Sequence, residues 1–469
     1  MSSLGAGRVF MGDSLGFHIL FALFGVGIPL LISLAELIGI VRKDSDYYTM
    51  AKRWSFAMGT LFVVGGISGL IISNQMSLLW PTFMTFAGKV IGAPFYMEGF
   101  AFFIEAIFLG IYLYSWDKFK NKYTHWLCSI PVVLGSVASA FFITTANAWM
   151  NSPAGFTYAN GVISNVNPLK AMFNPATYTE TSHSIVAYYL TTALVFGSIY
   201  AWGMIFHRHR MKKLAEKGIT IPTDAEHAKL HAYRKKVLVF VMTIAAVFTV
   251  LMMITGDQSA RYLAYHEPLK LASAELLLHT ESEAPIVIGG IAIPHNDNDN
   301  DADDIRYGIK IPELLSILSF GSTDAVVKGL DAFDPNTWPP LWIHSMFDLM
   351  VGFGMFIGFT VAVFFITYFW KRRHAFSKLT LFLIALAGPA SFLAMEFGWI
   401  VTEVGRQPYV IAGIMTASQA FTTSPEVIKF GSIFPSLYTV LLIVTPWVLI
   451  HHYKKTPLVL GEDHFAADK

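Results

Sequence analysis

Long apolar segments separated by polar ones dominate this chain. Nine of them reach the roughly 20 mostly apolar residues that a helix needs to cross a bilayer. They cover residues 15–41, 55–79, 94–115, 126–149, 183–206, 237–255, 341–369, 379–403 and 431–451. The pattern predicts an all-α integral membrane protein in three parts: helices one to six (1–255), a long loop (256–340), and helices seven to nine with a tail (341–469).

Composition supports this prediction and excludes other classes. Of the 469 residues, 54% are hydrophobic and only 14% are charged, whereas soluble domains carry about 25% charged residues. A soluble globule, a disordered chain and a nucleic-acid binder are therefore excluded, and the net charge of +1 offers no field for polyanions. The one cysteine, Cys128, excludes a disulfide framework, thiolate-bound iron–sulfur clusters and c-type haem attachment.

The distribution of basic residues predicts the orientation. Alternate loops and the C-terminal tail carry 23 of the 33 Lys and Arg, and the N-terminus with the remaining loops carries 10. Because basic loops stay inside, we expect the N-terminus outside, the C-terminus inside and the loop 256–340 outside. In that loop, residues 295–304 read HNDNDNDADD, which fits either a calcium site or a solvated acidic turn.

Ionisable side chains within the apolar segments are functional candidates, because burying them in lipid is costly. Potential ligands or acids gather in the outer halves of the predicted helices: His18, Glu98, His183, Met350 and Glu403. Glu105 lies seven residues after Glu98, on the same helix face, as a proton relay or an ion path would require. These residues favour a redox or proton-coupled membrane protein. The alternatives are a carboxylate-based ion or solute transporter without haem, and structural hydrogen bonds between helices.

Several longer motifs point to one family. They are GAPFYMEG (92–99), FFIE (102–105), TANAWMNSP (145–153), GDQS (256–259), KLASAE (270–275) and EFGWIVTEVGRQP (396–408). In order and spacing the sequence resembles subunit I of the cytochrome bd-type quinol oxidases. The resemblance implies an enzyme of a prokaryotic cell membrane that oxidises quinol outside and reduces dioxygen to water with inside protons, without pumping. It also implies a partner subunit II, with or without a small accessory subunit.

The same resemblance assigns expected roles to individual residues. The axial ligands of a low-spin haem b would be His183 and Met350. Ligands in a pair of high-spin haems, one haem b and one haem d or a third haem b, would be His18 and Glu403. The proton route would use Glu98, Glu105 and Ser139. Residues linked to quinol binding would be Lys270 and Glu275, in the outside quinol-binding loop. Residues close to the haems would be Trp399 and Arg406.

Two positions depart from the family pattern. Asp348 stands where the family commonly has an arginine two residues before the methionine ligand, and Ser73 stands where it often has a glutamate. A carboxylate does not pair with a haem propionate unless one of them is protonated, so the contacts of the low-spin haem are expected to differ. The outside quinol-binding loop is also of the shorter type, and together these departures favour a divergent, short-loop branch of the family. A haem-bearing subunit without catalytic activity is a further alternative.

Overall fold

Each apolar segment forms one long helix in the computed structural model, which describes residues 3–217, 224–292, 305–372, 374–422, 424, 431, 433–461 and 464–465. Among these residues, nine helices are long and apolar enough to cross a membrane. They are α1 (Ser3–Arg42), α2 (Ser45–Leu79), α4 (Gly92–Tyr114), α5 (Lys122–Asn151), α7 (Thr177–Glu216), α8 (Asp224–His266), α11 (Ile343–Trp370), α12 (Lys378–Val404) and α15 (Ile433–Lys455). The prediction of a helical protein with nine membrane spans is confirmed.

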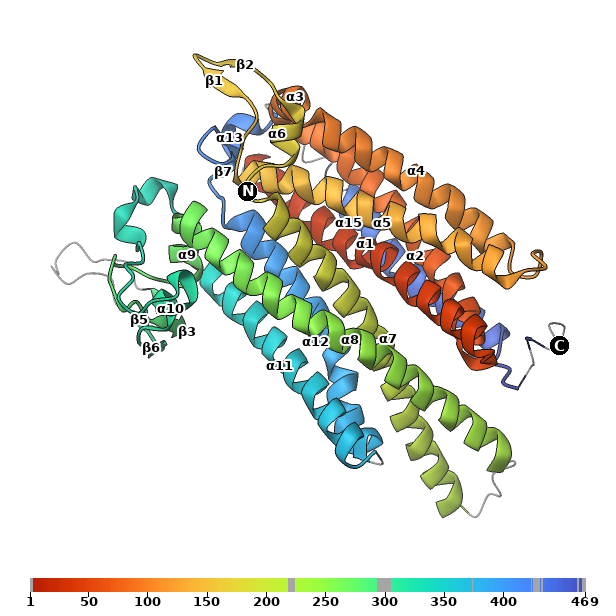
Figure 1. The fold of residues 1–469 in the computed structure, drawn as a ribbon. Coiled ribbons are helices and arrows are strands. Elements are labelled where there is room, and N and C mark those ends of the chain that lie inside the picture. Colours follow the sequence, from red (N-terminus) through yellow and green to blue (C-terminus); the bar gives the residue numbers. More distant parts are fainter. Residues whose placement is uncertain are drawn as a thin grey trace.

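Polar caps set the helix boundaries at one end of the bundle. The side chains of Asp44, Asn121 and Ser377 accept backbone hydrogen bonds at the starts of α2, α5 and α12. Such caps satisfy N–H groups that have no partner within the helix. All three caps lie at the end opposite the small elements, which we call the far end (Figure 1). Connections there are short, so consecutive helices pack antiparallel.

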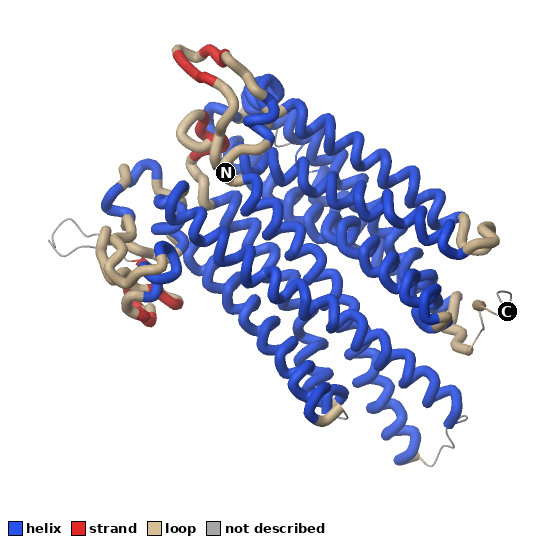
Figure 2. The backbone as a smooth tube through the Cα atoms, viewed as in Figure 1, coloured by secondary structure: helices blue, strands red, loops and turns tan. Residues whose placement is uncertain are grey.

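The small elements gather at the other end, which we call the loop end (Figures 1 and 2). Its short helices are α3 (Pro81–Val90), α6 (Pro168–Met172), α9 (Pro268–Ala274), α10 (Leu314–Phe320) and α13 (Ala417–Ala420), with 3-10 turns at Leu330–Ala332 and Pro335–Thr337. A third 3-10 turn, His374–Phe376, lies between α11 and α12. The N-terminus lies at the loop end.

Four antiparallel strand pairs complete the loop end. They are β1 (Thr157–Ala159) with β2 (Val162–Ser164), β3 (Ile286–Ile288) with β6 (Ile309–Ile311), β4 (Ile291–Ala292) with β5 (Ile305–Arg306), and β7 (Tyr409–Ile411) with β8 (Met415–Thr416). The acidic segment 295–304 joins β4 to β5 and lies outside the described residues.

Helix packing separates a buried interior from an apolar outer surface. α1 packs on α2, α4 on α5, α7 on α8 and α12, and α11 on α12, with α1 also touching α5 and α7. Large apolar side chains remain exposed on the outer faces, for example Leu70, Phe103, Phe359 and Trp447. A surface of this kind suits lipid or another membrane subunit.

Candidate functional site

His18 of α1 is oriented by a serine of the neighbouring helix. Its Nδ1 lies 2.9 Å from Ser68 Oγ of α2. The Ser68 hydroxyl donates its single proton to the backbone carbonyl of Val64 or Gly65. Its oxygen therefore accepts from His18 Nδ1–H, which leaves the lone pair on Nε2. Within the described part of the chain Nε2 has no hydrogen-bond partner, so it suits a metal ligand.

His183 of α7 repeats this arrangement with a threonine. Its Nδ1 lies 3.3 Å from Thr255 Oγ1 of α8, and that hydroxyl donates to the carbonyl of Leu251 at 3.0 Å. The proton again belongs on Nδ1, and no described residue bonds to Nε2. Both histidines that the sequence singled out are thus held in the tautomer that metal-bound histidines use.

Two glycines let neighbouring helices approach the expected ligands closely. A Cβ atom on Gly398 of α12 would lie 3.1 Å from Met350 Sδ of α11. A Cβ atom on Gly69 of α2 would lie 3.2 Å from His18 Cε1. Both distances are tighter than most real Cβ contacts, so the helix spacing at these two points depends on glycine.

The carboxylates of α4 face α5. Ser139 Oγ donates to Glu98 Oε1 at 3.1 Å. Glu105 is 4% exposed, and its Oε1 is buried without a hydrogen-bond partner among the described residues. The structure therefore brings Glu98 and Ser139 together, and it leaves Glu105 with an unsatisfied oxygen one heptad further along the same face.

Arg406 follows α12 and pairs with Glu403. Its Nη2 donates to Glu403 Oε2, while Asn147 of α5 donates to Glu403 Oε1. The Arg406 side chain is 6% exposed, yet its Nε and Nη1 have no partner in the part of the chain that the structure describes. Unpaired buried donors cost about 1–3 kcal/mol each, so an anionic group is expected beside them. Trp399 packs one helical turn before Glu403, against the buried residues around Met395.

Lys270 of α9 reaches the same region through side-chain amides. Its Nζ donates to Glu267 Oε2 at 3.0 Å and to Asn151 Oδ1 at 3.3 Å. Asn151 in turn donates to Asn147 Oδ1 at 3.3 Å, and Asn147 bonds Glu403. One buried hydrogen-bonded chain thus runs from Lys270 to Glu403 and on to Arg406.

Sequence reasoning did not assign a role to Asn147, Asn151, Glu180 or Glu267, which all belong to this network. Glu180 Oε1 accepts from Asn151 Nδ2 at 2.7 Å, and its Oε2 is buried with no described partner. The two asparagines were present in the motif TANAWMNSP, which is the signal that could have found them. The two glutamates lie in no quoted motif.

Glu275 and Asp348 lie together where the loop meets α11. Glu275 is 7% exposed, and burial, reinforced by the negative charge of Asp348, raises the pKa of Glu275 to about 8. Asp348 Oδ2 accepts from Gly289 N at 2.6 Å. His344 Nε2 lies 2.8 Å from Gly289 O and its Nδ1 lies 2.7 Å from Ala274 O. Asp348 thus binds the loop, which is a contact its place in the sequence did not suggest.

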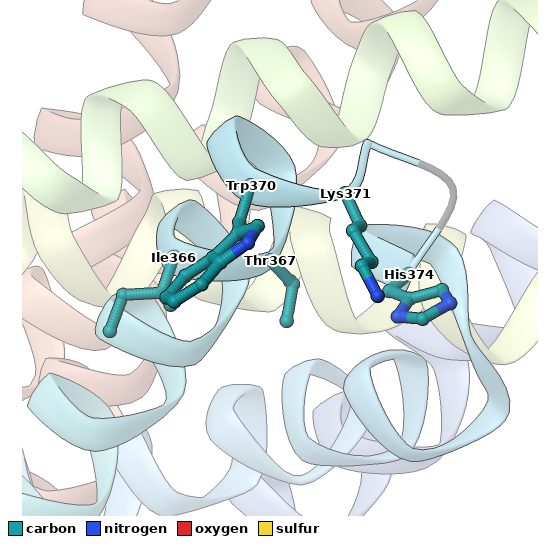
Figure 3. A pocket seen from close by; sticks show the side chains of 5 residues that line it. All are labelled: Ile366, Thr367, Trp370, Lys371 and His374. Atoms are coloured by element: carbon teal, nitrogen blue, oxygen red, sulfur yellow. The ribbon is translucent and has the colours of Figure 1, made fainter.

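The candidate ligands do not form a compact metal site within the described residues. Among the described residues, no group of three or more His, Cys, Asp or Glu could hold a metal ion. One pocket lies at the far end of α11, away from the site. It is lined by Ile366, Thr367, Trp370, Lys371 and His374 (Figure 3). Ile366 lies sixteen residues beyond Met350, about 24 Å along the helix.

These features define a helical membrane protein with isolated ligand-type side chains at one end of the bundle and a buried polar chain beside them. The model of the family "Cytochrome bd terminal oxidase subunit I" matches residues 7–457. The chain belongs to this family, and the predicted quinol:oxygen oxidoreductase class is confirmed.

Relatives agree over nearly the full length. A protein of Bacillus subtilis (strain 168), provisionally named cytochrome bd menaquinol oxidase subunit I, is 36% identical, with 98% of each chain covered. The cytochrome bd ubiquinol oxidase subunit 1 of the same organism is 29% identical, over 97% of this chain and 94% of the relative. The solved structure of bd oxidase from Geobacillus thermodenitrificans matches with a TM-score of 0.86 and 39% identity, over 97% of this chain and 99% of that one.

Family membership also indicates the general role, the cofactors and the assembly of this chain. It supports a terminal quinol oxidase role, haem cofactors in general, and a membrane complex with a second subunit in a bacterial respiratory chain. These matches give no support to the alternative of a haem-free transporter.

Proposed function

We propose that this chain is the haem-bearing subunit of an oxidase that oxidises quinol at the outer membrane face and reduces dioxygen with protons from the inside. The uneven distribution of Lys and Arg supports this orientation, with the loop end outside and the far end inside. Because protons are released on one side and taken up on the other, charge separates without a pump. Subunit II, with or without a small accessory subunit, completes the complex.

The haem assignment depends mainly on one observation: His18 and His183 each bond a hydroxyl through Nδ1 and leave Nε2 free. One such histidine would suffice to hold a haem iron from the protein side. When bound, haem would supply one-electron transfer and a binding position for dioxygen.

The proposed ligand sets follow the family pattern. His183 and Met350 would hold a low-spin haem b. His18 and Glu403 would serve the high-spin pair, a haem b with haem d or with a third haem b. Glu403 keeps lone pairs free on both oxygens despite its bonds to Asn147 and Arg406. The unpartnered Nε and Nη1 of Arg406 suit a propionate, beside Trp399.

The side chains that would bind quinol lie at the loop end of the bundle. Lys270 lies within the short helix α9, Glu275 caps the C-terminal end of that helix, and both residues are buried. We propose that deprotonated Glu275 accepts a proton from a quinol hydroxyl while Lys270 orients the ring oxygens. Menaquinol is the first substrate to test, because the 36% identical relative carries it in its name.

Protons for water would travel along α4. Glu105, with its unsatisfied oxygen, would pass a proton to Glu98, where Ser139 holds the carboxylate in place. A carboxyl group suits this role because burial lets it both accept and donate protons near neutral pH.

Visible spectroscopy combined with respiration tests this proposal. The purified complex should show reduced b-haem bands, a carbon monoxide difference spectrum and quinol-driven oxygen uptake, and His183→Ala should lose the low-spin component selectively. Absence of haem absorption would support the transporter instead. Haem spectra without oxygen uptake would support a non-catalytic subunit.

A further inference from the structure

A second cluster of buried ionisable groups lies toward the far end of the bundle. Glu36 of α1, Tyr112 of α4 and His125 of α5 are each no more than 1% exposed. His125 Nδ1 lies 2.6 Å from Glu36 Oε1, and the Tyr112 hydroxyl donates to Glu36 Oε2 at 2.8 Å. Charged residues are seldom buried so completely unless they are paired, and the proposed function leaves these three without a role.

The hydrogen-bond partners of this cluster determine how many protons it holds. His125 Nε2 lies 3.0 Å from the carbonyl oxygen of Tyr112, which only accepts, so Nε2 carries a hydrogen. The single hydroxyl proton of Tyr112 is directed at Glu36 Oε2. One proton therefore lies between Glu36 Oε1 and His125 Nδ1, held either as imidazolium with carboxylate or as imidazole with carboxylic acid. A pair that shares one proton can take up or release another.

The packing of α4 against α5 connects this cluster with the proposed proton route. At one end Ser139 bonds Glu98, and at the other His125 contacts Tyr112. Between these contacts α4 advances fourteen residues and α5 retreats fourteen. The two antiparallel helices therefore stay in register from the first contact to the second, with the same faces turned toward each other.

Glu105 lies midway between the two contacts and packs against α5 at Gly135, where an added Cβ atom would lie 3.1 Å from Glu105 Cβ. Ser136 is the next residue of α5, and Ser129 lies about two helical turns nearer to His125. Both serines are 1% exposed. Ser129 Oγ also lies 2.8 Å from Ser33 Oγ, one turn before Glu36 on α1. The buried hydroxyls of Ser129 and Ser33 thus lie along the helices between the cluster and Glu105, whose Oε1 has no hydrogen-bond partner among the described residues.

We propose that the Glu36–His125 pair is the inner station of the proton route, taking protons from water at the far end and passing them to Glu105. The step moves a proton only, since the electrons come from quinol, and the inference rests on the proposed function. Tyr112 lies about 10 Å from Glu105 along α4, so the transfer passes through the serine hydroxyls or intervening water. The other titratable groups near the pair are Tyr48 and Cys128.

The test uses the whole oxidase complex with its second subunit, reconstituted in vesicles. Glu36→Gln keeps the shape of the side chain but cannot pass on a proton. We expect an unchanged haem spectrum, quinol-driven oxygen uptake at least about tenfold slower, and a larger solvent deuterium isotope effect. Glu36→Asp should restore part of the rate. Tyr112→Phe should slow uptake less, because it removes one donor and leaves the shared proton.

A matched control is Tyr200→Phe, which also removes one tyrosine hydroxyl. Tyr200 is half-buried, and its hydroxyl accepts a hydrogen bond from Trp54 Nε1 at 3.1 Å, away from this interface. It should leave both turnover and isotope effect unchanged. The inference is overturned if Glu36→Gln turns over normally, or if it and Tyr112→Phe lose haem and activity together, as a structural role would require. If the wild type itself lacks haem or quinol-driven uptake, the proposed function fails first.

Discussion

Substitution of Lys270 can distinguish a structural role of this residue from a role in quinol oxidation. Its side chain is 7% exposed, and its Nζ lies 3.0 Å from Oε2 of Glu267, whose side chain is 11% exposed. Lys270→Met keeps most of the volume but leaves Glu267 buried without its cation. Removing one partner of a buried ion pair costs about 3–5 kcal/mol. Ser152 still donates to Glu267 at 3.3 Å, so we expect about 3 kcal/mol, at the lower end.

The double variant Lys270→Met/Glu267→Gln removes both charges together. Because a buried ion pair can be replaced by neutral groups of similar volume at little cost, most of the lost thermal stability should return. Quinol-driven oxygen uptake should stay low in both variants, whereas an artificial donor that reduces the haems directly should still support uptake. Recovery of quinol oxidation in the double variant would show that Lys270 acts only by neutralising Glu267, and would refute the substrate role.

Three further predictions address other parts of the site. Glu105→Gln should retain haem spectra but slow oxygen uptake tenfold or more, and unchanged turnover would remove Glu105 from the relay. Thr255→Val leaves the Nδ1–H of His183 without its acceptor, so the midpoint potential of the low-spin haem should shift in a redox titration while haem is retained. The pKa of Glu275 is raised to about 8, and only its deprotonated form accepts a proton. The quinol oxidation rate should therefore rise as pH increases from 7 to 9, and Glu275→Gln should be slow with a flat profile over that range.

The nine spans were predictable because each needs only a local run of apolar residues. The ends of the helices were less predictable. The apolar segment of the sixth span stops at residue 255, yet α8 continues to His266. Hydropathy marks the lipid-facing length of a helix, whereas capping and tertiary contacts determine where it ends.

Long-range polar contacts could not be found from the sequence. Lys270 and Asn151 are 119 residues apart, and Asn147 and Glu403 are 256 apart. No local periodicity connects such positions, so only the folded helices reveal them. His125 was missed for a related reason: it lies at the start of a helix, where a histidine usually faces water, and only the approach of Glu36 from α1 shows that it is buried.

The glycines at positions 69 and 398 have a consequence for variation in this chain. Neither carries chemistry, but each sets how far a neighbouring helix lies from His18 or Met350. A single added methyl group would have to displace the imidazole or the thioether by a few tenths of an ångström. Under the proposed haem assignment, alanine at either position would therefore shift the absorption spectrum and midpoint potential of the nearby haem without replacing its proposed ligand.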